Sequence, residues 1–312
     1  MDVVSDAIAA VRIGRPSSDR VRVGGSWCTR LAPYDGAGFH VVLEGSCWLL
    51  PDGGAPVALG AGDAVLLPHG TGHVIADAPV DAAAVERAVL FEQWLDGPRQ
   101  RPGRAAGSGG REVEMLCGKY RLDRSRAHPL MTELPTVVRL PRRGGGHPEL
   151  GAAIELLGRE LDAHRPGSCI ALPSLLDLLL VYMIRSWMAE DTTGSWPAAL
   201  GDPVTTAALR AIHSAPAAAW TNERLAAEAG VSRPTLARRF TALVGRPPMA
   251  YLTWWRLSLA AALLRDTTDP LATVARRIGY GSPYAFSHAF KREFGATPGQ
   301  YRAAAAGQRP TG

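Results

Sequence analysis

Two short runs in the last third of the chain carry side chains that hydrogen-bond well to DNA. Each run begins with a serine, at positions 232 and 282, and holds arginine or lysine further along. Arginine reaches guanine O6 and N7 through paired N–H groups, and hydroxyl groups reach base edges or phosphates. The candidate DNA contacts are Ser232, Arg233, Thr235, Arg238, Arg239, Ser282, Pro283, Tyr284, Ser287, His288, Lys291 and Arg292.

A second set of candidates lies nearer the N-terminus, where histidine and cysteine offer metal or redox chemistry. His40, His73, Cys28 and Cys117 lie in four separate β-like runs. If the strands converge, two imidazoles and two thiolates suit zinc or another divalent metal, and a thiol pair suits redox sensing. The alternative is structural: the cysteines are small core residues and the histidines are hydrogen-bonded inside. No cofactor is required by the sequence.

Two helices joined by a tight turn are expected to position the first run. Thr221 is a helix N-cap, Gly230 supplies a left-handed turn residue, and Ser232 caps the following helix. Leu236 and Phe240 are four residues apart, so they share the inward face of that helix. This pattern predicts a helix-turn-helix unit.

The same unit recurs about fifty residues later, which is a stronger signal than one copy. The offset is 49 residues before the turn and 50 after it, because Gly281 is inserted. The matching pairs are Gly230 and Gly279, Ser232 and Ser282, Phe240 and Phe290, and Gly245 and Gly295. Between the copies, 247–266 predicts one long helix with an apolar stripe, which would hold the two units at a fixed separation.

From Ala275 to Arg302 the second unit resembles the signature of the AraC/XylS regulators, with a slight departure where Ala285 stands before Phe286. The resemblance implies two helix-turn-helix units whose second helices enter successive major-groove segments on one face of the duplex. It also implies that the first turns of both helices contact bases, whereas the later arginines and lysine contact phosphates.

The first half of the chain is predicted to be mostly β-structure. Between Val21 and Cys117, short apolar runs alternate with Gly, Pro and Asp, which is typical of an antiparallel barrel or sandwich. The run 62–73 fits G-x5-P-x-G-x2-H and resembles the second cupin motif, in which the residue at His73 binds metal. The region of the first motif, 36–45, holds only His40, so the usual catalytic metal set is incomplete. A sensor is therefore favoured over an enzyme.

Helical periodicity then sets the domain organisation. Residues 2–12 predict one helix, and after His147 the apolar spacing changes to that of two helices. The expected α+β fold has a cupin-like sensor barrel at 1–146, a helical connector and dimerisation segment at 147–190, a linker at 191–203, and an all-α domain with two helix-turn-helix units at 204–306.

Charge and composition restrict the function further. From Trp220 onward there are 13 Arg and Lys against five Asp and Glu, a net charge of +8 that leaves −3 for residues 1–219. A localised basic segment is typical of a polyanion-binding domain. The apolar stretch Leu178 to Ile184 is far shorter than a membrane span, and the N-terminus lacks signal-peptide features, so no membrane partner is expected and the cytoplasm is the predicted location. Reduced cysteines are expected there.

These features predict a homodimeric, sequence-specific DNA-binding transcription regulator, not an enzyme. Its expected partners are double-stranded operator DNA, a second copy of the chain, an unidentified small effector and, as a further candidate, RNA polymerase. A cupin metal enzyme, an oxygenase or isomerase fused to a DNA-binding module, is the main alternative. A DNA-repair protein with a reactive cysteine is a weaker alternative, because residues 204–306 contain no cysteine.

Overall fold

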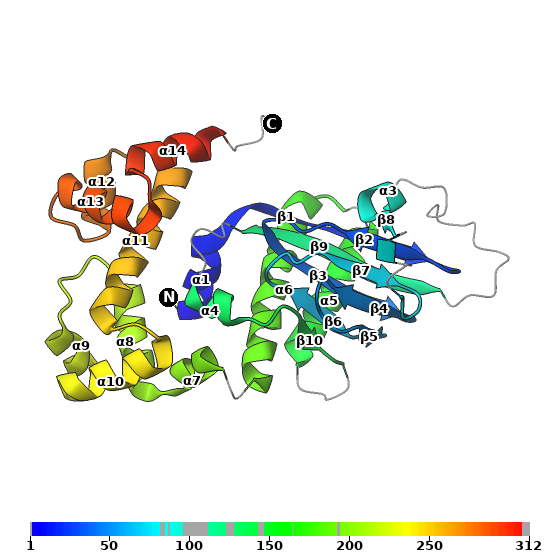
Figure 1. The fold of residues 1–312 in the computed structure, drawn as a ribbon, viewed down its shortest axis with the longest axis horizontal. Helices are drawn as coiled ribbons and strands as arrows, with labels where there is room; N and C mark the ends of the chain where they lie inside the picture. The colour runs from blue at the N-terminus through cyan, green and yellow to red at the C-terminus, as the bar shows by residue number, and fades with distance from the viewer. Residues whose placement is uncertain are drawn as a thin grey trace. The chain divides into compact units, whose positions relative to one another are not determined.

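The computed structural model describes residues 2–81, 85–86, 88–95, 112–122, 128–142, 147–163, 165–191 and 194–307. Strands occupy the first half of the chain and helices the second half (Figure 1). The expected α+β fold class, with an N-terminal β-domain, a helical connector and a C-terminal helical domain, is confirmed. The N-terminal helix predicted at 2–12 is observed as α1, Val3–Val11.

Ten strands of the described chain form two five-stranded sheets. One sheet has the order β1-β9-β3-β6-β10 and the other β5-β4-β7-β2-β8. Neighbouring strands are antiparallel except for the parallel pair of β2 and β8. The strands are β1 Arg12–Val23, β2 Cys28–Leu31, β3 Gly36–Glu44, β4 Ser46–Pro51, β5 Val57–Gly60, β6 Ala64–Leu67, β7 His73–Ala76, β8 Val89–Leu90, β9 Val113–Leu122 and β10 Val138–Leu140.

An apolar core between the sheets draws side chains from both. Val42 and Met115 come from the first sheet, whereas Leu49 and Ile75 come from the second. Alternate residues of a strand face opposite sides, so β9 directs Met115 and Cys117 into this core and leaves Glu114 and Leu116 for its other face. That second face is covered by the helical connector.

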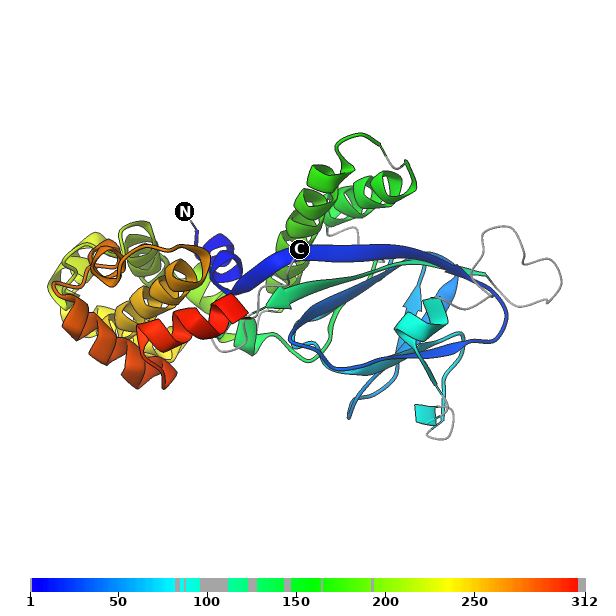
Figure 2. The same ribbon diagram turned by 90° about the horizontal axis from the view of Figure 1, so that it is seen from above.

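The connector consists of α5 (Pro148–Ala163) and α6 (Ser168–Glu190), which are the two helices expected after His147. Both contact β1, and Figure 2 shows the pair beside the sheet. The Tyr120 hydroxyl donates to the Leu176 carbonyl over 2.6 Å. By length and composition, α6 is the one helix of the described residues that reaches the size of a membrane span, a test that core helices also pass.

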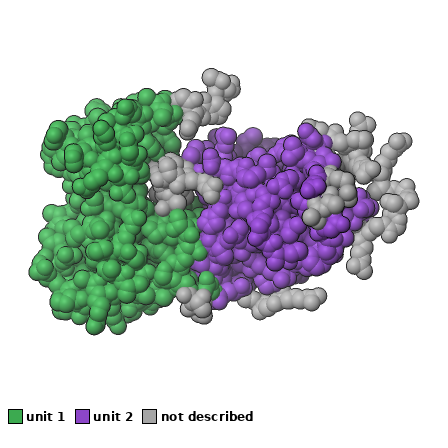
Figure 3. All heavy atoms as spheres, in the orientation of Figure 1, with its two compact units in different colours: residues 1–11, 125–133, 191–312 green, residues 12–124, 134–190 purple. Residues whose placement is uncertain are grey.

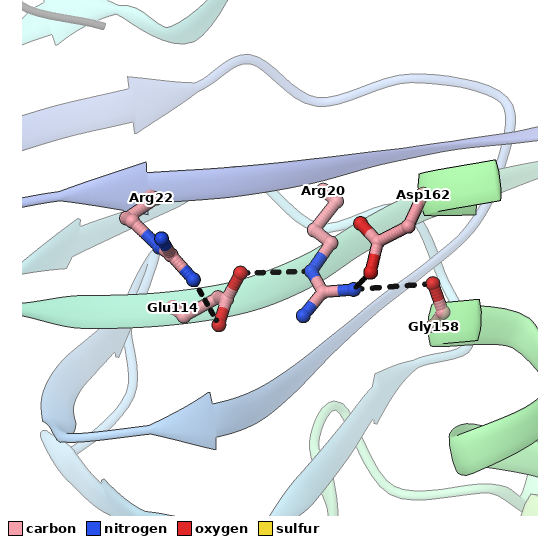
Figure 4. A network of polar contacts seen from close by, with 5 residues as sticks. All are labelled: Arg20, Arg22, Glu114, Gly158 and Asp162. Carbon is pink, nitrogen blue, oxygen red and sulfur yellow. Dashed lines mark hydrogen bonds and ion pairs between the residues drawn. The ribbon is translucent and has the colours of Figure 1, made fainter. Parts of the chain in front are cut away.

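A charged network fastens α5 to the sheet (Figure 4). Arg20 on β1 donates through Nε to Glu114 on β9 over 2.8 Å, and through Nη1 to the Gly158 carbonyl over 3.1 Å and to Asp162. Arg22 pairs with the other oxygen of Glu114 at 3.0 Å. The Glu114 side chain is buried, and the two guanidinium groups hold its pKa below the usual value although burial opposes the shift. This network ties α5 to the β1–β9 pair.

Three helices are short: α3 (Phe91–Leu95), α4 (Pro129–Glu133) and α7 (Ser195–Gly201). Residues 191–203 were expected to form a linker, yet α7 lies inside this stretch and buries Trp196 and Ala199. The later helices are α8 Pro203–Ser214, α9 Asn222–Glu228, α10 Arg233–Val244, α11 Pro248–Asp266, α12 Leu271–Arg277, α13 Pro283–Phe294 and α14 Pro298–Gly307.

The chain divides into two compact units that do not follow its order in sequence (Figure 3). One unit contains 12–124 and 134–190, with the two sheets and the connector. The other contains 191–312 together with 1–11 and 125–133. Helices α1 and α4 therefore belong with the C-terminal helices, although the domain boundaries expected from sequence place both segments in the sensor domain.

Candidate nucleic-acid interface

Helices α9 and α10 form the first helix-turn-helix unit. The Thr221 hydroxyl accepts from the Arg224 backbone N–H at 3.3 Å, and the Ser232 hydroxyl accepts from the Thr235 N–H at 3.4 Å, so both helices have side-chain caps. Gly230, in the turn, has a φ of +65°, and Gly245, after α10, has a φ of +75°. These left-handed residues end the helices as the sequence predicts.

Helices α12 and α13 repeat this geometry. They have the same lengths as α9 and α10, seven and twelve residues. The Ser282 hydroxyl caps α13 by accepting from the Ala285 N–H at 3.1 Å. Gly279 and Gly295 have φ values of +81° and +73°. The offsets of 49 and 50 residues therefore mark two equivalent units.

The apolar residues of each second helix lie inside. Leu236 and Phe240 of α10 and Phe286 and Phe290 of α13 are fully buried, whereas Phe294 is partly buried against Phe290. Because these residues fix which face of each helix points inward, they also fix which side chains point outward. Both outward faces carry the candidate DNA contacts.

All twelve candidate DNA contacts lie on α10, α13 or their caps, and ten of them are exposed. Thr235 and Ser287 are half-buried. Among the described residues, Tyr284 is the most exposed large apolar side chain, at 84%, and it lies in the first turn of α13. An aromatic ring left in solvent on a helix surface is suited to contact a thymine methyl group or a sugar.

Two of the arginines make ion pairs within the protein. Arg233 pairs with Glu223 of α9 at 2.6 Å, and Arg239 pairs at 3.4 Å with Asp202, the N-cap of α8. These exposed or half-exposed pairs are weak enough to exchange for phosphate. Arg256 of α11 instead donates to the Pro216 and Ala218 carbonyls over 2.7 Å, and burial lowers its pKa. Arg256 therefore holds the loop before α9 and is no DNA contact.

Helix α11 joins the two units through their cores. Tyr251, Trp254 and Trp255 near its start are buried in the first unit, as the predicted apolar stripe requires. Further along, Leu257 and Leu264 join the core of the second unit with Phe286 and Phe290. A continuous helix packed into both cores fixes the spacing of α10 and α13.

In the β-domain, three of the four metal or redox candidates meet. His40 Nε2 lies 2.8 Å from His73 Nε2, and His40 Nδ1 lies 3.1 Å from Cys117 Sγ. His73 Nδ1 lies 3.0 Å from the Thr71 carbonyl, which can only accept. The protons are therefore assigned in one direction: Cys117 S–H to His40, His40 N–H to His73, and His73 N–H to Thr71.

Burial keeps this row of groups uncharged. Desolvation lowers the pKa of His73 to about 4 and, with the neighbouring His73, lowers the pKa of His40 well below its ordinary value. Burial also raises the pKa of the Cys117 thiol. Both histidines and the cysteine are 3% exposed or less. Uncharged donors and acceptors that satisfy one another are what a buried polar cluster requires.

The expected Cys2His2 set is not brought together. Cys117 and His73 contact opposite nitrogens of the His40 ring, so the three cannot bind one ion through these atoms. In the antiparallel register of β2 and β7, Cys28 lies opposite Ala76, whereas His73 lies opposite Leu31 at the other end of β2. Among the described residues, no group of three or more His, Cys, Asp or Glu is arranged to hold a metal ion. The cluster therefore does not fit a cupin metal.

A second buried polar row, in the C-terminal unit, has no counterpart in the sequence analysis. It joins Asp6 of α1, His213 of α8, Tyr251 of α11 and His128, which directly precedes α4. Their separation in sequence hides them from motif analysis. Their residue types offered one indication: Asp6 on the apolar helix 3–11 and His213 in α8 are polar residues that need a hydrogen-bond partner if they are buried.

Two family models match the chain. Residues 2–189 match a cupin family and residues 225–304 match a helix-turn-helix domain. A putative AraC-like transcription regulator of Streptomyces lividans is 35% identical over 306 residues, which cover 97% of this chain and 98% of that protein. The HTH-type transcriptional regulator AlkR of Acinetobacter baylyi is 29% identical over 310 residues, 97% of this chain and 99% of AlkR.

The chain is also similar to a solved DNA-binding domain, that of the global transcriptional factor AdpA in complex with a target DNA. The identity is 36%, with 36% of this chain and 99% of that chain covered and a TM-score of 0.33. The two full-length relatives are transcription regulators and not enzymes.

Proposed function

This chain belongs to the AraC family of DNA-binding transcription regulators with an N-terminal cupin domain, and we propose that α10 and α13 read its operator under the control of a signal received between the two sheets. The observation that carries the proposal is the duplicated unit, in which α10 and α13 share length, caps and buried phenylalanines while turning polar side chains outward. Helices of this kind enter the major groove.

Base contacts are assigned to the first turns. Ser232, Arg233 and Thr235 on α10, and Ser282, Pro283 and Tyr284 on α13, are the candidates for reading base edges. Phosphate contacts are assigned to the later residues, which are Arg238, Arg239, Ser287, His288, Lys291 and Arg292. The local net charge of +8 supports such phosphate binding.

Replacing Arg238 with Ala tests the interface, because this exposed residue lies on the outward face of α10. We expect operator affinity to fall by about 1–3 kcal/mol and, for a phosphate contact, the salt slope to fall by about 1. Arg139→Ala on β10, where the arginine side chain is 52% exposed, is the matched control and should bind as wild type. Equal affinities for Arg238→Ala and wild type at two salt concentrations would contradict the assignment.

The signal is proposed to act on the row of Cys117, His40 and His73. Because burial raises the pKa of Cys117, and burial also raises that of the half-buried Cys28, neither thiol is poised as a reactive thiolate. Of the two signals considered, a small effector that exchanges hydrogen bonds with this row is favoured over an oxidant. Cys117 of this row lies on β9, whose other face carries Glu114 of the network that holds α5.

Dimerisation is proposed to use α5 and α6. Three large apolar side chains remain open on this pair: Leu156 at 46% exposed, Ile170 at 77% and Leu178 at 38%. Only 28% of the most apolar window of α6 is buried within the chain. Uncovered apolar helix surface is typical of subunit interfaces, and a second copy is the occupant proposed here. Operator binding, and any contact with RNA polymerase, would take place in the cytoplasm, which is the location proposed for this protein.

A further inference from the structure

Four buried polar side chains form a continuous row in the C-terminal unit. Asp6 Oδ2 lies 2.9 Å from His213 Nδ1, His213 Nε2 lies 2.9 Å from the Tyr251 hydroxyl, and that hydroxyl lies 2.9 Å from His128 Nε2. His128 Nδ1 accepts from the Leu130 backbone N–H at 3.1 Å. The row thus crosses from α1, through α8 and α11, to the segment 128–133.

Only one arrangement of protons satisfies every member with neutral histidines. Since His128 Nδ1 is an acceptor, the ring carries its proton on Nε2 and donates to Tyr251. The Tyr251 hydroxyl then donates to His213, whose Nδ1–H donates to the Asp6 carboxylate. Removing Asp6 would leave the His213 N–H without its acceptor, in a position that is 2% exposed.

Aromatic packing closes the row off from water. The His128 ring lies 4.9 Å from the Trp196 ring and 5.3 Å from the Trp254 ring, measured between centroids, and the His213 ring stacks on Trp255 at 4.3 Å. Glu133 adds a second attachment, because its carboxylate accepts from the Trp196 backbone N–H at 3.1 Å and from the Ser195 hydroxyl. Helix α1 and the segment 128–133 are therefore built into the helical unit.

The row contacts α10, the second helix of the first helix-turn-helix unit. The Tyr251 ring packs edge-on against Phe240 of α10, with centroids 5.7 Å apart. Helix α7, which Glu133 holds, also contacts α10. The outward side chains of α10 stay exposed with α1 and 128–133 in place. The docked arrangement therefore leaves the DNA-contacting face free.

Both docked segments continue from the same end of one strand pair. Helix α1 ends at Val11 and β1 begins at Arg12, while β9 ends at Leu122, a few residues before His128. Arg12 and Leu122 are partners in the antiparallel register. A change in the pairing of β1 and β9 would therefore move both segments together.

We propose that α1 and residues 128–133 form a clamp that holds α8, α10 and α11 in the DNA-binding arrangement, and that the β1–β9 pair releases it when the signal is received. This inference rests on the proposed DNA-binding function. Because the row is fully satisfied only when both segments are docked, docking of one segment favours docking of the other.

The test uses the full-length protein with Asp6→Ala, and with Asp6→Asn as a matched control that keeps an oxygen acceptor for His213. Hydrogen–deuterium exchange is measured without DNA. We expect Asp6→Ala to exchange at least about tenfold faster over Pro203–Ser214 and Arg233–Val244, and at the wild-type rate over α12 and α13. Its affinity for operator DNA should fall by a similar factor, whereas Asp6→Asn should behave as wild type.

Each other outcome is informative. Unchanged exchange over α8 and α10 in Asp6→Ala would overturn the clamp. Faster exchange in Asp6→Ala with unchanged DNA affinity would show that the clamp does not control DNA binding. If Asp6→Asn behaved like Asp6→Ala, the arrangement of protons with neutral histidines would be wrong. If wild type bound no DNA, the proposed function would fail, and the exchange data would still decide whether the clamp exists. Tyr251→Phe, which keeps the ring against Phe240, checks the same row from its centre and should match Asp6→Ala.

Discussion

At the level of single residues, each buried histidine is hydrogen-bonded within a directional row, and burial disfavours the charged form of His40, His73 and His128. His40 and His73 are satisfied between Cys117 and a backbone carbonyl, and His128 and His213 are satisfied between a backbone N–H and Asp6. Burial lowers the pKa values of His40, His73 and His128. A histidine that stays neutral when folded but takes a proton when unfolded makes stability depend on pH.

The sign of that dependence follows from His73. Between about pH 6.5 and its folded pKa of about 4, the unfolded chain binds more protons, so the free energy of unfolding decreases as the pH falls. One such group contributes up to about 1.4 kcal/mol per pH unit. We expect His73→Gln to flatten the slope of stability against pH over this window, measured by urea unfolding at several pH values. An unchanged slope would mean that His73 is protonated in the folded protein.

At the scale of elements, the turns of the two helix-turn-helix units are equivalent in conformation but differ in their surroundings. A Cβ added to Gly279, with φ +81°, would lie 2.7 Å from the Ala217 carbonyl oxygen. A Cβ added to Gly230, with φ +65°, would meet nothing within 4 Å. The first substitution combines backbone strain with a clash against backbone, and the second brings strain alone.

Alanine at these two positions should therefore have unequal costs. Gly230→Ala is expected to destabilise the protein by about 1–2 kcal/mol, the cost of a left-handed residue with a side chain. Gly279→Ala should cost more, because the Ala217 segment must also shift. Thermal unfolding of both variants gives the comparison, with Gly281→Ala as the control since its Cβ would also meet nothing within 4 Å. Equal decreases in melting temperature for Gly230→Ala and Gly279→Ala would show that the contact with the Ala217 segment adds no cost.

The elements that sequence predicts well are those encoded locally. Caps such as Ser232 and Ser282, left-handed glycines and helical spacing lie within a few residues of one another, so both helix-turn-helix units could be placed. The long helix at 247–266 was likewise correct as α11, Pro248–Asp266. The cupin-like run ending at His73 located one residue of the buried row correctly.

What the sequence leaves open depends on contacts between distant segments. Strand register decides that Cys117 and not Cys28 joins His40, and no local pattern encodes it. In the same way, Asp6 and His128 contact residues that lie 207 and 123 positions later in the chain, so no local pattern predicts their docking. Helix α7 was missed because a seven-residue helix containing Pro197 resembles a linker.

At the level of the whole molecule, the apolar surface left open on α5 and α6 is the proposed dimer interface. If a second copy covers it, Ile170→Asp, at a residue that is 77% exposed, should shift the protein from dimer to monomer without unfolding it. Val89→Asp on β8, at a residue that is 47% exposed, is the matched control and should remain dimeric. Analytical ultracentrifugation distinguishes the two states. A dimer that survives Ile170→Asp would place the interface elsewhere.

We propose that α10 and α13, held apart by α11, read two neighbouring stretches of one operator. Hydroxyl-radical footprinting on DNA selected from random fragments tests it most directly. We expect two protected stretches on one face of the duplex, about one helical turn apart for each protein copy. Arg238→Ala should weaken one stretch and Lys291→Ala the other. A single protected stretch, or equal weakening of both stretches by each substitution, would contradict the account.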